Sequence, residues 1–181
     1  MLEVHKAPAL LEGTAEWLAR TSGILRAHVQ DQSREMLDRR PRANAWSQTE
    51  ILAHLADFEV ICFQARVETI LAGLPVLPMK PDKRAVDIPY AAMNPFASLD
   101  RFSQDREQSL KRIRQLSPDQ LACRAVHAEL GEITLGNLLA EWVIHDLSHL
   151  RQLVMAAAEA FLPAAGPWRP AYPHLELGAA A

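Results

Sequence analysis

Cysteine is scarce in this sequence, and long apolar runs are missing. The chain of 181 residues has only two cysteines, Cys62 and Cys123, and neither belongs to a Cys-x-x-Cys pair, which excludes a disulfide framework. No apolar stretch approaches the length of a membrane span. The first residues, MLEVHKAPALLEG, lack the apolar segment of a secretory signal. We therefore expect a cytoplasmic protein without a membrane partner, in which Cys62 is an ordinary core residue.

An excess of charge of one sign is also absent. The formal net charge is −3 at pH 7, which gives no electrostatic reason to expect a nucleic acid partner. The basic clusters at 39–42 and 111–114 are interpreted as solvated helix ends and faces. An apolar content of 49% and a charged content of 23% are typical of globular proteins. The length suits a single domain over residues 1–181, with an irregular tail from about residue 161.

Helical periodicity dominates the rest of the chain. Four helices are predicted near residues 8–30, 47–73, 98–116 and 134–160, and no segment alternates convincingly with the period of a strand. The second helix opens with a capping box, Ser47 and Glu50, flanked by Trp46 and Ile51 as a hydrophobic staple. Its inward face is expected to carry Ile51, Leu55, Phe58, Cys62 and Ala65.

The segment 74–97 is rich in proline. Five prolines in this segment argue against a regular helix: Pro75, Pro78, Pro81, Pro89 and Pro95. Long loops in compact domains are often functional, so part of this one is expected to pack over a bundle end or groove and to shape a pocket. Its length also permits a crossover along the bundle, which would let the second and third helices run parallel.

Two histidines lie four residues apart in the predicted fourth helix, within the stretch HDLSH. When the apolar ladder of that helix is continued from Trp142, it reaches His145, His149 and Gln152. Both imidazoles are therefore expected to point inward. A pair at this spacing can bind one metal ion from a single helix face, as in the zincin helix. Hydrogen-bonded core histidines are the alternative.

A third histidine, His54, lies on the inward stripe of the second helix, between Ile51 and Phe58. Three inward imidazoles from two helices can form a tridentate metal site with coordination positions left open for water or substrate. His28 is interpreted instead as a hydrogen-bonded core residue. We reject a metalloprotease reading of HDLSH, because Asp146 is a methylene shorter than the glutamate of HExxH and no histidine follows at the metzincin spacing.

The combined pattern resembles that of the DinB/YfiT-like superfamily. The residues that carry the resemblance are WSxxEILAHLxDxE, the proline-rich loop and GEITLGNLLAEWVIHDLSHLRQL, and it spans nearly the whole chain. The resemblance implies an all-α four-helix bundle with up-down-down-up connectivity. It also implies a divalent metal ion, nickel or zinc, held by His54, His145 and His149. Some relatives use low-molecular-weight thiols, and homodimer formation is an expectation that rests on the resemblance alone.

Two functions remain open at this stage. One is a metal-dependent enzyme acting on a small molecule, either a hydrolase using water or an S-transferase using a thiol. The other is a non-catalytic bundle that binds metal or a ligand in a stress response. Asp57, one turn after His54, is a candidate to orient a ligand or accept a proton, and an exposed helix charge is the alternative. Gln152 is a candidate hydrogen-bond partner of a metal-bound water. Glu59 is read as structural, and Asp146 as able to pair with another helix.

Overall fold

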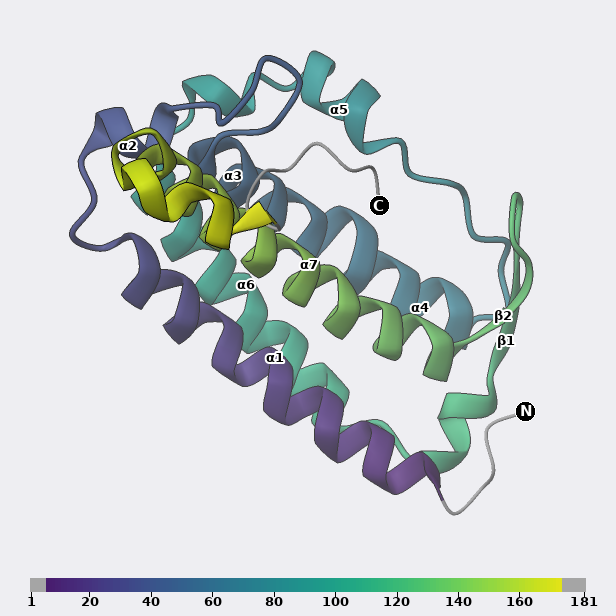
Figure 1. Ribbon diagram of the computed structural model, residues 1–181. Coiled ribbons are helices and arrows are strands. Elements are labelled where there is room, and N and C mark those ends of the chain that lie inside the picture. The colour runs from purple at the N-terminus through teal and green to yellow at the C-terminus, as the bar shows by residue number, and fades with distance from the viewer. Residues whose placement is uncertain (1–5, 174–181) are drawn as a thin grey trace.

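Four long helical rods run the length of the molecule in the computed structural model, which describes residues 6–173 (Figure 1). They are α1 (Ala7–Val29), the continuous unit formed by α3 (Gln48–Phe58), a π-helical segment (Glu59–Gln64) and α4 (Ala65–Leu71), then α6 (Pro95–Arg114) and α7 (Leu135–Phe161). The predicted all-α four-helix bundle is confirmed. Its up-down-down-up order stays a prediction. None of the helices within residues 6–173 has the length and apolarity needed to span a membrane.

The shorter elements lie in the connections. They are α2 (Arg34–Asp38), α5 (Pro81–Asp87), the 3-10 segments η3 (Tyr90–Ala92) and η4 (Pro118–Ala122), the strands β1 (Arg124–His127) and β2 (Gly131–Thr134), and the 3-10 segment η5 (Leu162–Ala171). The tail predicted to be irregular from about residue 161 thus begins with 3-10 turns, which are broken at Gly166 by a positive φ of 52°. Residues 174–181 of that tail and residues 1–5 at the start lie outside the described residues.

Local capping determines where the two site-bearing helices begin. The Ser47 hydroxyl accepts the Glu50 amide at 3.2 Å, and the Glu50 carboxylate accepts the Ser47 amide at 2.9 Å, so the predicted capping box is confirmed. Thr134 and Asn137 form the same arrangement at the start of α7. These starts place His54 within the first two turns of α3 and His145 about three turns into α7.

The π-helical segment changes which face of the second rod is buried. Its i→i+5 turn shifts the helix register, so that Cys62 and Phe63 are both buried. The prediction that Ala65 faces inward is therefore wrong, because Ala65 is exposed while Val67 and Ile70 enter the core. Phe63 stacks on Trp142 with ring centroids 4.8 Å apart, which joins the π segment to α7.

The sequence showed no convincing strand, and the structure contains a short hairpin. Strands β1 and β2 pair antiparallel from Arg124 opposite Thr134 to His127 opposite Gly131. Gly131 adopts a φ of 77°, which glycine tolerates without a steric penalty. Each strand has four residues, and their burial depends on α4 and α7 rather than on an alternating pattern of their own. A strand this short leaves little periodicity to detect.

The proline-rich connection contains a short helix, α5, where no regular helix was predicted. Pro81 occupies its first turn, where the missing N–H is harmless, and the next proline comes only at Pro89. Upstream of α5, Val76 pairs with the hairpin through the carbonyl of Val126 at 2.9 Å. In Figure 1 the connection runs from the hairpin past α5 to the end of the bundle near α2. Such a lengthwise course is what the predicted crossover requires.

The core has two apolar clusters along the bundle. One surrounds Leu18, Phe63 and Leu139, and the other surrounds Leu25, Phe102 and Leu153. The buried guanidinium of Arg106 links helices of the core. It donates hydrogen bonds to the Leu18 carbonyl and to carboxylates on two other helical segments.

Candidate metal centre

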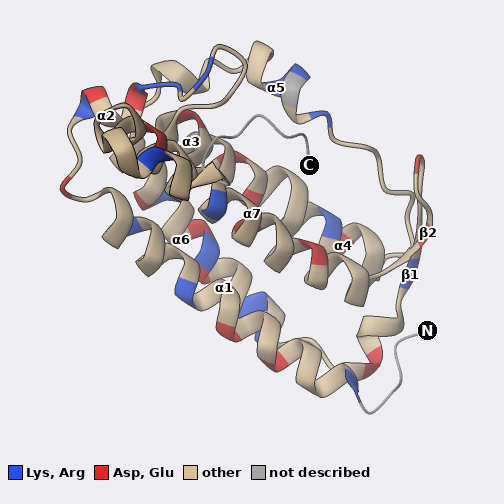
Figure 2. Cartoon of the chain, viewed as in Figure 1, with Lys and Arg blue, Asp and Glu red and all other residues tan. Residues whose placement is uncertain are grey.

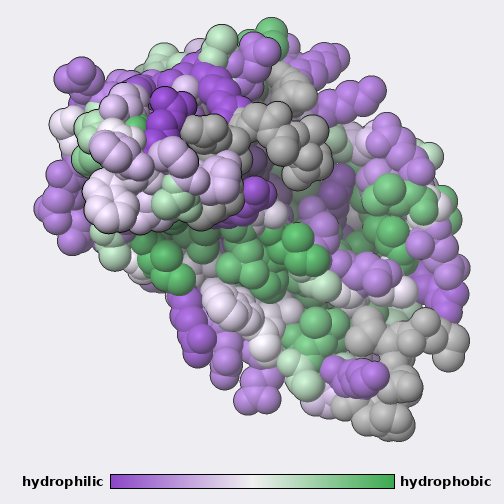
Figure 3. Space-filling view, in the orientation of Figure 1, coloured by the Kyte–Doolittle hydropathy of each residue, from purple (hydrophilic) through white to green (hydrophobic). Residues whose placement is uncertain are grey.

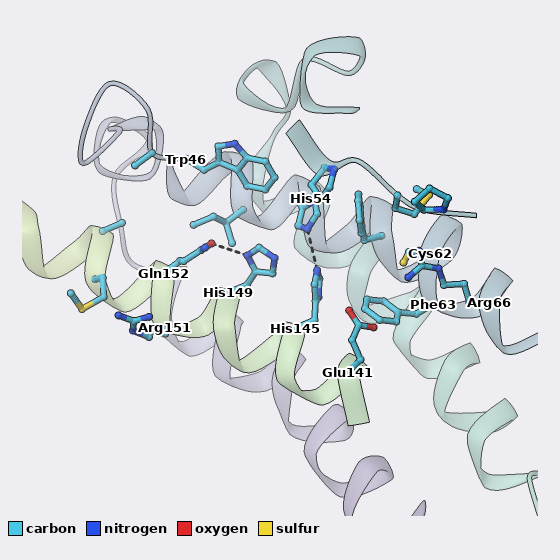
Figure 4. A pocket seen from close by; sticks show the side chains of 18 of the residues that line it. Trp46, His54, Cys62, Phe63, Arg66, Glu141, His145, His149, Arg151 and Gln152 are labelled. Carbon is cyan, nitrogen blue, oxygen red and sulfur yellow. Dashed lines mark hydrogen bonds between the residues drawn. The ribbon is translucent and has the colours of Figure 1, made fainter. Parts of the chain in front are cut away.

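The three predicted histidines meet at one point between α3 and α7. His54 Nε2 lies 3.1 Å from His145 Nε2, although the two residues are 91 positions apart in the chain. One ring nitrogen from each of His54, His145 and His149 lies within 4.8 Å of the others. Figure 4 shows the three imidazoles turned toward one another, with His54 on the opposite side from the other two.

The spacing of the His54 and His145 nitrogens suits two ligands of a single ion. Two imidazole nitrogens bound at about 2.0–2.1 Å with an angle of roughly 90–110° between them are separated by about 2.8–3.4 Å. The separation between the Nε2 atoms of His54 and His145 falls within that range. The donor set is three imidazoles, which suits zinc and nickel.

A hydrogen bond sets the tautomer of His149. Its Nδ1 lies 2.8 Å from Oε1 of Gln152, one helical turn later. An amide oxygen only accepts, so Nδ1 must carry the proton and donate it. The Nε2 atom of His149 is then left with its lone pair free for a metal ion. Gln152 therefore lies beside the cluster, bonded to one of the three histidines.

Burial keeps two of the imidazoles neutral. Desolvation, followed by the repulsion of His149 and His145, lowers the pKa of His54 to about 2. Desolvation and His145 lower the pKa of His149 to about 4, against the opposing effects of Gln152 and Asp146. The neutral imidazole is the form that binds a metal ion, so these two side chains are ready to do so near neutral pH without losing a proton.

Two nitrogens of the cluster are buried without a hydrogen-bond partner among the described residues, Nδ1 of His54 and Nδ1 of His145. If both rings bind through Nε2, each Nδ1 carries the proton. The nearest acid to Nδ1 of His145 is Asp146, whose Oδ1 lies 3.8 Å away. Metal-bound histidines commonly donate this second N–H to a carboxylate, and a small movement would complete that bond here.

Asp146 is held by a buried ionic network. Arg106 of α6 donates to Asp146 at 2.6 and 3.2 Å and to Glu59 at 2.8 and 2.8 Å. Trp142 and Ser109 also donate to Glu59. Burial alone would raise the pKa of Asp146, but Arg106 and His145 hold it below its usual value. The pairing of Asp146 with another helix and the structural reading of Glu59 both agree with this arrangement.

Asp57 is bonded to the proline-rich connection rather than to a histidine. Its carboxylate accepts hydrogen bonds from the guanidinium of Arg84 and, at 2.7 Å, from the hydroxyl of Tyr90. Burial opposes ionisation, but Arg84 and Tyr90 outweigh it and lower the pKa of Asp57. Asp57 is 7% exposed, so it is not a solvated helix charge. In this structure it anchors α5 and η3 to α3.

The cluster forms part of the wall of a cavity of about 730 Å³. That volume lies within the range of small-molecule sites. Pro78, Met79 and Pro81 line the cavity, which confirms the prediction that the segment 74–97 shapes a pocket. Trp46 also lines it and contacts two of the histidines, with its ring centroid 4.8 Å from His54 and 6.3 Å from His149.

Sequence reasoning missed Glu141 on the cavity wall. Its side chain is exposed and lines the cavity, and Figure 4 shows its carboxylate beside His145. Packing around it raises the pKa of the carboxyl group, although His145 and Arg66 oppose that shift. The signal in the sequence that could have found Glu141 is its position four residues before His145, on the same face of the helix. A raised carboxyl pKa makes Glu141 a better proton acceptor than an ordinary glutamate.

Two other residues behave as expected from the sequence. His28 lies on α1, apart from the cluster, with Nε2 3.1 Å from Oε1 of Gln48. Cys62 is buried, and burial raises the pKa of its thiol to about 12. A neutral, buried thiol is a poor nucleophile, although Cys62 does contribute to the cavity wall.

An all-α bundle with three inward histidines beside a cavity is the class of protein that these features define. The chain belongs to the DinB superfamily, whose sequence profile matches residues 18–153. A solved structure with a similar fold is described in the words "YfiT from Bacillus subtilis is a probable metal-dependent hydrolase with an unusual four-helix bundle topology". The two chains are 20% identical, with a TM-score of 0.75 over 83% of this chain and 87% of that one. No curated protein matches this sequence.

Proposed function

We propose that this protein is a metal-dependent enzyme that holds one divalent ion through His54, His145 and His149 and acts on a small molecule bound in the adjoining cavity. The observation that carries the proposal is the convergence of three imidazoles from two helices on the wall of that cavity. Zinc or nickel suits the donor set. The description of YfiT, which has a similar fold, as a probable metal-dependent hydrolase supports this proposal.

A divalent ion in this site supplies Lewis acidity, which polarises a bound oxygen and makes a coordinated water or thiol more acidic. The protein's own groups provide the rest. Gln152 keeps the proton of His149 on Nδ1. Glu141, with its raised pKa, is placed on the cavity wall to take up or return a proton. Asp57 acts through the connection that it anchors and so helps to shape the cavity.

Hydrolysis is the reaction that Glu141 favours, because a proton acceptor beside the histidines would serve a water nucleophile. Thiol S-transfer is the second candidate. The cavity volume is large enough for a low-molecular-weight thiol together with a small substrate. A non-catalytic metal- or ligand-binding bundle, as in a stress response, is the alternative from another class. A non-catalytic bundle would need the three histidines but would not need Glu141 as a proton acceptor.

Metal binding is the first test. The purified protein is stripped with a chelator and titrated with zinc and with nickel by calorimetry, and one ion should bind per chain. His149→Ala should lose metal affinity by more than the roughly 10–100-fold expected when an outer hydrogen-bond partner is lost, because only two of the three imidazoles are left to bind the ion. His28→Ala is the matched control and should bind as the parent does. Equal binding by His149→Ala and the parent would contradict the proposal.

The class of reaction needs a second experiment. The metal-loaded protein is assayed on a panel of esters, amides and electrophiles, with and without an added thiol. Turnover without a thiol that Glu141→Gln lowers, at unchanged metal content, supports hydrolysis. Turnover only with a thiol supports S-transfer. Full metal loading with no turnover on any member of the panel would favour the non-catalytic alternative.

A further inference from the structure

A histidine outside the metal-binding cluster, His127 at the end of β1, also lines the cavity. It is buried, with 6% of its surface exposed. Its Nδ1 accepts the backbone N–H groups of Glu129 and Leu130 at 3.2 and 3.3 Å. A backbone N–H only donates, so Nδ1 carries no proton and the proton of the ring lies on Nε2. His127 therefore presents a hydrogen-bond donor through Nε2.

The Nε2–H of His127 has no hydrogen-bond partner within residues 6–173, where only Nδ1 of the ring is bonded. Two other ring nitrogens are fully buried without a partner among those residues, Nδ1 of His54 and Nδ1 of His145, and Nε2 of His127 is not one of them. It keeps contact with the cavity that His127 lines. Polar groups at buried positions are nearly always paired, and a molecule in the cavity can supply this acceptor.

The backbone on both sides of His127 is fixed. Strand β1 pairs with β2, which places His127 opposite Gly131. On the other side, Val76 donates to the Val126 carbonyl at 2.9 Å and accepts the Ala128 amide at 3.2 Å. A donor that is held in place before a ligand arrives loses little conformational freedom on binding.

Arg66 of α4 lies at the same end of the cavity. Its guanidinium donates to the Leu77 carbonyl at 3.1 Å, and Leu77 directly follows the residue that pairs with His127. Arg66 is half-buried and forms no ion pair with the described residues, so most of its five N–H donors remain available. Figure 4 shows its guanidinium beside Cys62, across the histidine cluster from Arg151.

Two carboxylates also line this end of the cavity, Glu129 and Glu141, and both are exposed. Arg66 lowers the pKa of Glu141, but the described residues include no ion pair between them. Figure 2 shows basic residues on α4 and acidic ones on α7 and at the hairpin tip. Figure 3 shows the surface hollowed between the hairpin and the bundle, with hydrophilic residues in the hollow. The less exposed groups at this end are the two donors, Arg66 and His127.

We propose that Arg66 and His127 form a subsite for an anionic group of the substrate, a carboxylate or a phosphate, whose oxygens accept hydrogen bonds from the guanidinium and from Nε2–H. Both anions match the planar fork of an arginine, and such charge-assisted hydrogen bonds are the strong ones. Figure 4 shows Phe63 between Arg66 and His145, which gives an apolar body a surface from the subsite to the histidines. The inference rests on the proposed function for the reaction at the histidines, whereas anion binding itself needs no metal ion.

The test uses the metal-stripped protein, so that the oxygens of a probe cannot bind the ion. Four phenyl compounds are titrated by ligand-observed NMR: phenylacetate, phenylphosphate, neutral phenylacetamide and the cation phenethylamine. At least one of the two anions should bind about tenfold or more tightly than phenylacetamide. The tighter anion identifies the group as a carboxylate or a phosphate. Preference for phenylacetamide or phenethylamine, or no binding of either anion, would overturn the proposal.

Two variants remove the donors separately. Arg66→Met removes the charge at a similar length and should weaken anion binding by about tenfold or more. His127→Asn keeps a side-chain oxygen that can accept the amides of Glu129 and Leu130 in place of Nδ1, but it lacks the Nε2–H. It should weaken anion binding by roughly 3–10-fold. Both variants should keep the helical circular dichroism and the metal binding of the parent.

Matched controls are Arg151→Met, at the other arginine of the cavity wall, and Val126→Asn, at a side chain of the same strand that is 61% exposed. Both should bind the anion as the parent does. Parent-like anion binding by Arg66→Met or His127→Asn, or an equal loss in Arg151→Met, would overturn the proposal. Metal titration of His149→Ala is a separate measurement, so failure of the metal centre and failure of the anion subsite are distinguishable.

Discussion

At the scale of the single residue, Gln152 determines which nitrogen of His149 can bind a metal ion. The contact is local, three residues along one helix, and its 2.8 Å hydrogen bond leaves Nε2 of His149 unprotonated. Replacing Gln152 with Ala frees the ring to rotate and to change tautomer. We expect metal affinity to fall about 10–100-fold, as is usual when an outer hydrogen-bond partner is lost. Calorimetric titration with zinc measures the change.

The exposed Gln115 supplies the matched control for this variant, since Gln115→Ala removes a glutamine side chain far from the histidines. Its metal affinity should equal that of the parent. Parent-like affinity in Gln152→Ala would mean that the hydrogen bond plays no part in orienting His149.

At the scale of the element, Asp57 attaches the proline-rich connection to α3. Arg84 and Tyr90 bind the same carboxylate from α5 and η3, so the carboxylate closes a loop that also lines the cavity. Asp57→Asn removes the charge, and the free energy of unfolding should fall by about 1–3 kcal/mol near neutral pH. Asp100→Asn, at an exposed ion pair with Arg26, should cost about 1 kcal/mol or less.

The contribution of the Asp57 charge to the free energy of unfolding should depend on pH in a defined direction. The pKa of Asp57 is lowered in the folded protein, so its contribution is complete above the unfolded value of about 3.9 and is lost as the pH falls through the lowered pKa. The difference in unfolding free energy between the parent and Asp57→Asn should therefore shrink on acidification below about pH 4. A difference that stays constant into acid would show that the charge of Asp57 contributes nothing. Denaturant titrations at several pH values measure it.

At the scale of the whole molecule, Arg106 connects all four rods. It binds the Leu18 carbonyl on α1, Glu59 in the π segment and Asp146 on α7, and it is itself part of α6. Its side chain is 2% exposed. Arg106→Met would leave two buried carboxylates without a counter-ion, and we expect the free energy of unfolding to fall by about 3–5 kcal/mol. Chemical denaturation measures the loss.

Arg112 is the matched arginine on the same helix. It pairs with Glu68, but that pair is exposed, so Arg112→Met should cost no more than about 1 kcal/mol. Equal losses in the two arginine variants would mean that burial of the network has no energetic importance.

Much of the candidate site could be predicted because its members are linked by local spacing. The capping box at Ser47 and Glu50 sets the start of α3, and a period of 3.6 residues then turns His54 inward. His145, His149 and Gln152 follow one another at helical steps on α7, so their common face is a property of the helix alone. The sequence also predicted that the second rod would end near residue 73, ahead of the prolines, and α4 ends at Leu71.

Other features depended on contacts between distant parts of the chain. The register of Ala65 required knowledge of the π segment, whose Glu59 is held by Arg106, 47 residues away. The hairpin forms only where Val76 and α7 lie beside it, and Asp57 finds its partners 27 and 33 residues later. The sequence by itself determined the helices and the faces that carry the histidines, because backbone hydrogen bonding and side-chain period act over a few residues. Only the tertiary structure decided which nitrogens meet and which carboxylates are paired, because packing and charge act between residues far apart in the chain.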